Sequence, residues 1–179
     1  MITESVKIRV ERPGDYGAIR QVIRRAFKKN ADELEGAADV VELLRERKKA
    51  VVALVADVED QVVGHIMFSP VTVAEAPERF RAVGLAPLTV LPEFQNSGIG
   101  LKLTREGLQA CRRYGYDAVV VLGHPHYYPR FGFSRAKDFR LDNEYNANDA
   151  FMVMELHEGV LGTISGLVKF APEFREAGC

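Results

Sequence analysis

The start of the chain changes from a strand pattern to a helix pattern. Val6, Ile8 and Val10 alternate with charged residues, which predicts a half-buried strand. Residues 13–15 (Pro-Gly-Asp) predict a turn, and Asp15 is a candidate N-cap for the helix that follows. The apolar residues of that helix recur with helical spacing at Ile19, Val22, Ile23 and Phe27.

A second amphipathic helix is predicted over residues 39–47. Its apolar residues Val40, Leu43 and Leu44 are expected to face the core. Residues 30–36, which separate the two helices, are polar and acidic, so we expect a loop there.

Three strands are predicted next, and the first two form a hairpin. Residues 51–58 are apolar and β-branched, residues 59–61 form a short polar turn, and residues 62–73 form the partner strand. Residues 81–91 form the third strand, which Pro87 is expected to interrupt.

A helix and another strand follow. The helix places four apolar residues on one side: Ile99, Leu103, Leu108 and Cys111. It ends with Arg112 and Arg113, which suit the negative end of the helix dipole, and with Gly115 as the residue after the cap. Residues 118–122 are apolar and predict a buried strand. Strand, turn, helix and strand in this order predict a right-handed parallel crossover.

The last part of the chain is more irregular. Residues 142–149 are polar and predict a loop, residues 151–156 a late strand, and residues 160–170 one more edge strand. Residues 172–179 are expected to be frayed. The organisation is that of one α/β domain.

Composition narrows the classes of protein. A chain of 179 residues with 47% hydrophobic side chains has the length and apolar content of one folded domain. Two cysteines cannot build a disulfide framework, and a net charge of −1 argues against nucleic acid as a partner. The longest apolar run, residues 50–56, is too short to span a membrane. The N-terminus lacks the pattern of a signal peptide, so we expect a cytoplasmic protein with no membrane partner.

The turn between the third strand and the next helix carries the candidate chemistry. It reads Gln95-x-x-Gly98-x-Gly100. The first N–H groups of a helix have no internal partner, the dipole there favours negative charge, and glycines let a phosphate approach the backbone. The segment suits a pyrophosphate, although the glycines could simply permit a tight turn. It is neither a Walker P-loop nor the Gly-x-Gly-x-x-Gly of nicotinamide-nucleotide folds.

The wider segment Leu88-Thr89-Val90-x-Pro92-x-x-Gln95-x-x-Gly98-x-Gly100 resembles the signature of the GNAT superfamily of N-acetyltransferases. In that superfamily the loop holds the pyrophosphate of acetyl-coenzyme A (acetyl-CoA). A second element, Tyr128-x-x-x-Gly132-Phe133, lies just after the next strand and is common in the same superfamily. It belongs to a Tyr-Tyr-x-x-Phe-Gly-Phe segment at residues 127–133.

The resemblance implies a fold. It is an α/β fold with a central mixed, mostly antiparallel sheet, flanked by helices, whose parallel strands splay at the cofactor site. One such domain would fill residues 1–179, with a core over about 6–157 and a C-terminal extension over 158–179.

The resemblance also implies a site. The residues that would bind acetyl-CoA are Leu88, Thr89, Val90, Gln95, Asn96, Ser97, Gly98, Ile99, Gly100 and Tyr128. The backbone N–H of Leu88 or Val90 would stabilise the thioester oxygen, beside a bulge that Pro87 suits. Tyr128 would protonate the leaving thiolate, although packing of a short helix is its other possible role. One departure is the sequence Gly-His-Pro at 123–125, where many members carry an asparagine.

Other candidate residues leave alternatives open. The base is not assigned among Glu33, Glu35, Asp57, Glu75, Glu144 and His65, and His65 is favoured as a hydrogen-bonded core residue. Lys102 and Arg105 could add charge near the phosphates or form a solvated face. His124 and His126 alone do not make a metal site, so we expect no metal. Cys111 is expected to be a core residue and Cys179 an exposed one.

The function expected from the resemblance is transfer of an acetyl group from acetyl-CoA to a primary amine, by direct attack on the thioester. The acceptor would be a small molecule or a peptide, and a homodimer is left open. Acidic residues at 32–35 and 142–144 would suit a cationic acceptor. The alternatives are an acyl-CoA sensor without transferase activity, and a metal-dependent hydrolase using His65, His124 and His126.

Overall fold

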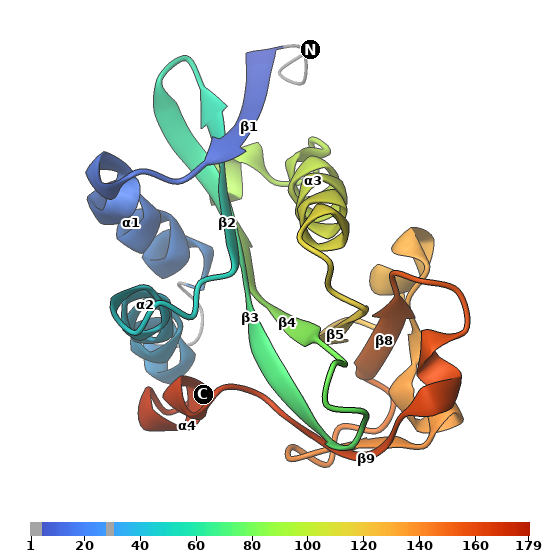
Figure 1. Ribbon diagram of the computed structural model, residues 1–179. Coiled ribbons are helices and arrows are strands. Elements are labelled where there is room, and N and C mark those ends of the chain that lie inside the picture. Colours follow the sequence, from blue (N-terminus) through green and yellow to red (C-terminus); the bar gives the residue numbers. More distant parts are fainter. Residues whose placement is uncertain (1–4, 28–30) are drawn as a thin grey trace. The chain divides into compact units, whose positions relative to one another are not determined.

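The computed structural model describes residues 5–27 and 31–179, without the side chains of residues 31–35. The chain forms two compact units. Figure 1 shows their helices and strands. The first unit comprises residues 1–68, 87–109 and 172–179, and the second comprises residues 69–86 and 110–171. Among the described residues, no helix combines the length and apolar character needed to cross a membrane.

The first unit is built on antiparallel strands. β1 (Val6–Val10) pairs with β2 (Val52–Val58), which pairs with the first part of β3 (Gln61–Glu75). The next strand, β4 (Ala82–Val90), is the neighbour of β3. The chain reverses between β3 and β4, and the Leu91 N–H donates to the Val63 carbonyl at 2.8 Å, so this pair is also antiparallel. The predicted hairpin at residues 51–73 is confirmed.

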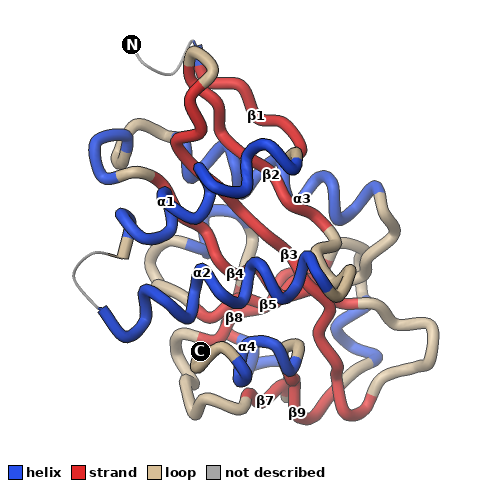
Figure 2. The backbone as a smooth tube through the Cα atoms, turned by 90° about the vertical axis from the view of Figure 1, so that its left-hand side faces the viewer, coloured by secondary structure: helices blue, strands red, loops and turns tan. Residues whose placement is uncertain are grey.

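Helices cover both faces of these strands (Figures 1 and 2). α1 (Tyr16–Ala26) and α2 (Ala31–Glu46) lie side by side against one face, and α3 (Ile99–Arg113) lies on the other. Their apolar positions are buried as the spacing predicts, since Ile23, Leu44 and Leu103 are all 0% exposed. Leu43 and Phe27 are exceptions, because both are only half-buried and Phe27 lies just beyond the end of α1.

The second unit contains the parallel strand pair that the predicted crossover joins. β4 runs parallel to β5 (Ala118–Leu122), and β5 pairs antiparallel with β8 (Phe151–Glu155). β8 also pairs with the short β6 (Ser134–Arg135). β9 (Ser165–Lys169) pairs antiparallel with the end of β3 and parallel with β7 (Leu141–Asn143). The sheet pairings are therefore mixed and mostly antiparallel, as the resemblance implied.

Short helical segments complete the fold. α4 (Pro172–Glu176) belongs to the first unit. The 3-10 helices are η2 (Pro13–Asp15), η3 (Pro92–Phe94), η4 (Tyr128–Phe131), η5 (Ala136–Phe139) and η6 (Val160–Thr163).

The expected loop over residues 30–36 is wrong from Ala31 onward, because α2 begins there; residue 30 lies outside the described residues. Alanine, glutamate and leucine in this stretch favour a helix, and acidity does not oppose one. Gly36 packs closely against the C-terminal segment, since a Cβ there would lie 2.7 Å from the Ala177 carbonyl oxygen. A small residue is therefore required where the sequence suggested a loop.

The C-terminal residues are ordered rather than frayed. α4 buries Phe174, and the Glu173 side chain is only 1% exposed. The Glu173 carboxylate pairs with Lys49 at 2.8 Å and with Arg47 at 3.2 Å. Burial alone would raise the pKa of Glu173, but these cationic partners hold it below its ordinary value. Long-range ion pairs of this kind leave no periodic signal in the sequence.

The structure corrects three further predictions made from the sequence. Pro87 does not interrupt β4, which runs through it. Residues 142 and 143 of the expected loop pair with β9 as part of β7. Residues 160–170 are not one edge strand: η6 precedes β9, which has neighbours on both sides.

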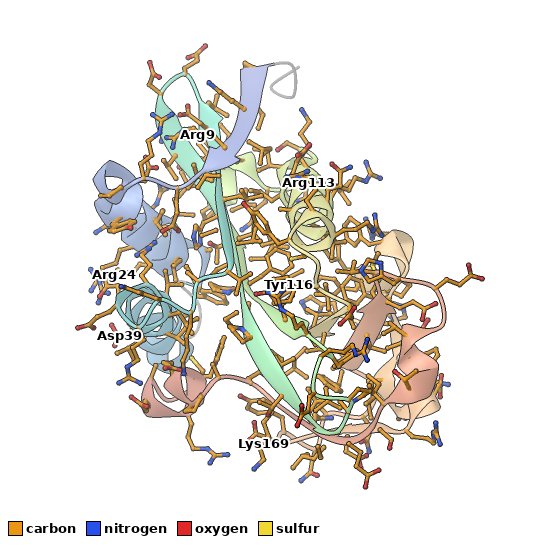
Figure 3. The ribbon with its side chains drawn as sticks, in the orientation of Figure 1. Arg9, Arg24, Asp39, Arg113, Tyr116 and Lys169 are labelled. Carbon is orange, nitrogen blue, oxygen red and sulfur yellow. The ribbon has the colours of Figure 1, made fainter. Side chains whose placement is uncertain are left out.

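The Asp15 carboxylate binds residues that precede α1 in place of capping that helix. Asp15 is the N-cap residue of α1 by position but makes no side-chain cap bond to that helix. Its carboxylate instead accepts from the Arg12 backbone N–H and from Arg9, which also pairs with Asp57. Arg9 is labelled in Figure 3, as is Asp39 of α2, which pairs with Arg20 of α1 at 3.1 Å.

Candidate active site

The loop between β4 and α3 is held by its own side chains. The Gln95 amide Nε2 donates to the Val90 carbonyl at 2.9 Å, and the Ser97 hydroxyl donates to the Phe94 carbonyl. Asn96 and Gly98 have φ values of +60° and +86°. Glycine adopts such a conformation without strain, which explains the residue type at position 98.

The loop delivers the chain to the N-terminus of α3. The Lys102 N–H donates to the Gly98 carbonyl, so the N–H groups of Ile99, Gly100 and Leu101 lie in the first turn, where an α-helix offers no internal acceptor. Gln95 and Asn96 are exposed, Gly98 and Gly100 are half-buried, and Ile99 anchors the turn in the core. Free N–H groups, a helix dipole and glycines suit a phosphate.

The strand before the loop presents a mixed surface. Leu88 and Val90 are half-buried, whereas Thr89 is 3% exposed. The Thr89 Oγ1 has no hydrogen-bond partner among the described residues. These are the positions that the resemblance assigns to the pantetheine arm.

Tyr128 lies in η4 of the second unit and is buried. Its ring packs edge-on against Tyr127 and Phe133, with centroids 5.0 Å and 5.5 Å away. Burial, and then the neighbouring Tyr127, raise the pKa of Tyr128, so the phenol keeps its proton at neutral pH. Both predicted roles, proton donor and aromatic packing, remain compatible with this environment.

The departure at residues 123–125 has a steric reason. A Cβ at Gly123 would lie 2.4 Å from Cε2 of Tyr128. An asparagine at position 123 would therefore collide with the ring as it is placed here.

At least three of the six candidate bases have hydrogen-bond or ion-pair partners. Asp57 pairs with Arg9, and Glu75 accepts a hydrogen bond from the Ser165 hydroxyl. The side chains of Glu33 and Glu35 lie outside the described residues. His65 is fully buried, and its Nε2 lies 2.9 Å from Glu11 Oε1, which confirms it as a hydrogen-bonded core histidine.

Glu11 and Arg45 form a cluster with His65 that the sequence did not predict. The Glu11 carboxylate also pairs with Arg45 of α2, whose guanidinium lies 3.9 Å from the centre of the Tyr16 ring. Distant parts of the chain supply this buried cluster, so no local motif could have revealed it.

The remaining candidate residues are the two cysteines and two basic residues of α3. Burial raises the pKa of Cys111 to about 12, which leaves no thiolate to act as a nucleophile, and Cys179 is exposed as predicted. Lys102 is half-buried and Arg105 is exposed. No three histidine, cysteine or carboxylate side chains cluster as a metal site in the described part of the chain.

Comparison with known proteins agrees with this geometry. The acetyltransferase (GNAT) domain family matches residues 7–136. The chain is 38% identical over 169 residues to YhbS of Escherichia coli K12, described as an uncharacterized N-acetyltransferase, and the match covers 93% of this chain and 97% of that protein. The chain therefore belongs to the GNAT acetyltransferase family.

Two solved structures are similar over nearly the whole chain. E. coli YhbS in complex with CoA has a TM-score of 0.87 and 36% identity, over 96% of this chain and 92% of that one. A GNAT acetyltransferase of Brucella melitensis in complex with acetyl-CoA has a TM-score of 0.79 and 36% identity, over 94% and 97%.

Proposed function

We propose that this protein is an acetyl-CoA-dependent N-acetyltransferase that transfers an acetyl group to a primary amine by direct attack on the thioester. The observation that carries the proposal is the loop from Gln95 to Gly100, with Gly98 at φ +86° at the start of α3. The CoA and acetyl-CoA complexes of the two relatives support it.

The loop and β4 would bind the cofactor. Backbone N–H groups between Asn96 and Gly100 would receive the pyrophosphate, with Gln95 and Ser97 holding the loop in shape. Leu88, Thr89 and Val90 would pair their backbone with the pantetheine arm. Acetyl-CoA supplies the thioester that an unprotonated amine can attack.

Two groups of the chain would act on the reaction. Negative charge develops on the thioester oxygen as the amine attacks, and the backbone N–H of Leu88 or Val90 would stabilise it. Tyr128 would give its proton to the departing sulfur, because a phenol is protonated at neutral pH. The group that takes the proton from the amine is not assigned.

The acceptor is best found by a thiol-release assay. The purified chain is mixed with acetyl-CoA and with small amines, polyamines, amino acids or peptides with a free N-terminus. The proposal expects release of CoA that depends on one of these classes. Binding of acetyl-CoA without release with any class would instead favour the sensor function.

Three finer points accompany the proposal. A cytoplasmic location is compatible with the free cysteines and with the lack of a membrane-spanning helix among the described residues. A cationic acceptor and a homodimer stay predictions. Charge reversal at Glu144 that leaves the KM of the acceptor unchanged would contradict a cationic acceptor bound there.

A further inference from the structure

Two of the buried polar atoms without a hydrogen-bond partner among the described residues lie on adjacent strands of the first unit. They are Nδ1 of His65 on β3 and Oγ1 of Thr89 on β4. His65 is 0% exposed and Thr89 is 3% exposed. A buried polar atom left without a hydrogen bond is costly, so both atoms call for a partner.

The strand register brings the two residues together. The Leu91 N–H donates to the Val63 carbonyl. Thr89 and His65 each lie two residues from this bond, and a Cβ at Gly64 would lie 3.3 Å from the Thr89 carbonyl oxygen, so the two residues are neighbours on adjacent strands. A Cβ at Gly64 would also meet Leu103 and Ile99 of α3, so the side chain of the next residue, His65, points away from that helix.

The chemistry of the two atoms is complementary. Burial alone would raise the pKa of Glu11, but hydrogen bonds from His65 and Arg45 hold it below its ordinary value, so the carboxylate stays charged. A charged carboxylate only accepts, so His65 Nε2 carries the proton that points to Glu11. His65 Nδ1 is then an acceptor, and the Thr89 hydroxyl is a donor.

We propose that Glu11 and His65 are positioning residues for β4, in which hydrogen bonds through one water link the Thr89 hydroxyl to the acceptor His65 Nδ1, because the two atoms do not bond directly. This link fixes the strand segment 88–90 that would pair with acetyl-CoA. The expected effect on acetyl-CoA binding rests on the proposed function, whereas the hydrogen-bonded link between Thr89 and His65 does not.

The hydrogen-bonded link is tested by ¹⁵N NMR of the full chain labelled at histidine. In the unsubstituted chain His65 should be protonated at Nε2, with Nδ1 shifted as a hydrogen-bond acceptor. Thr89→Val should move the Nδ1 resonance toward that of a free lone pair, and Thr89→Ser should retain it. An Nδ1 resonance that is the same in the unsubstituted chain and in Thr89→Val overturns the proposal.

The positioning role is tested by acetyl-CoA affinity, measured by calorimetry. Thr89→Val should weaken binding about tenfold, and Thr89→Ser should bind nearly as the unsubstituted chain does. His65→Gln keeps a donor for Glu11 but loses the contact with Thr89, so it should weaken binding similarly. The double variant should add little, because one interaction is lost in all three.

Ser69→Ala is the matched control. Ser69 Oγ is another buried hydroxyl on β3 without a partner among the described residues, and its loss should leave the affinity unchanged. Unchanged affinity in Thr89→Val, despite a moved resonance, overturns the positioning role. Failure of the unsubstituted chain to bind acetyl-CoA would overturn the proposed function but leave the His65–Thr89 link standing.

Discussion

The ring of Tyr128 occupies the space in which a side chain at position 123 would lie. A Cβ at Gly123 would be 2.4 Å from Cε2 of that ring, well inside van der Waals contact. Gly123 is therefore required if Tyr128, the proposed proton donor, is to keep its present position.

Gly123→Ala should displace the Tyr128 ring. Overpacking of this kind costs about 1–3 kcal/mol of unfolding free energy, and we expect turnover to fall by more than stability explains. Thermal unfolding and initial rates of thiol release measure the two effects. Gly162→Ala is the control, because a Cβ there would have no heavy atom of the described residues within 4 Å beyond its local backbone. An unaltered rate in Gly123→Ala would show that the ring position does not matter.

Tyr128→Phe removes the phenol proton but keeps most of the aromatic packing. If Tyr128 protonates the thiolate, turnover should fall by about 100-fold, the lower end of general acid–base effects, with unchanged acetyl-CoA affinity. Tyr127→Phe is the matched control on the neighbouring residue and should be nearly normal. Equal rates for Tyr128→Phe and the unsubstituted chain would leave packing as the only role of this residue.

Stability should fall as the pH drops below about 6.5, where an unfolded histidine takes up its proton. Burial lowers the pKa of folded His65, although Glu11 opposes the shift. The unfolded state therefore binds more protons between these two pKa values, and the unfolding free energy decreases by up to about 1.4 kcal/mol per pH unit.

His65→Gln should abolish this part of the pH dependence, as measured by denaturant unfolding between pH 7.5 and 5.5. Glu11 titrates below this range, because its pKa is also lowered. His124→Gln, at an exposed histidine, is the control and should keep the slope. An identical slope in His65→Gln would mean that other groups cause it.

Glu173→Gln should destabilise the C-terminal helix against α2. The carboxylate is buried and pairs with Lys49 and Arg47, and hydrogen bonds to charged groups contribute about 1.5–3 kcal/mol. For a chain of this size we expect a Tm lower by roughly 3–12 °C. Glu176→Gln removes an exposed partner of Arg47 and should change the Tm little. Equal effects of the two substitutions would contradict the importance of burial.

The sequence predicted those elements whose signal is local. Alternation identified β1, helical spacing identified α1 and α3, and the strand–loop–helix order identified the loop at Gln95–Gly100 and its parallel crossover. It failed where distant contacts decide the structure. α4 is held by Arg47 and Lys49, which are more than 120 residues away along the chain.

The same distinction between local and distant features applies to the residues of the candidate site. Gly98 and Tyr128 could be named from short motifs, because a turn and a spacing are local features. The cluster of Glu11, His65 and Arg45 could not, since the loop after β1, β3 and α2 each supply one residue. Its residues can be recognised as a cluster only when the register of β3 and the position of α2 are known.

Thermal unfolding with acetyl-CoA tests the central claim most directly, with CoA, ATP and NAD beside it. Acetyl-CoA at 100 times its Kd should add about 2.7 kcal/mol, or roughly 5–10 °C in Tm. CoA should also raise the Tm, and ATP and NAD should not. Gly98→Val, which forces a β-branched residue to φ +86°, should unfold cooperatively but lose the shift. No shift in the folded, cofactor-free protein would contradict an acetyl-CoA site at Gln95–Gly100.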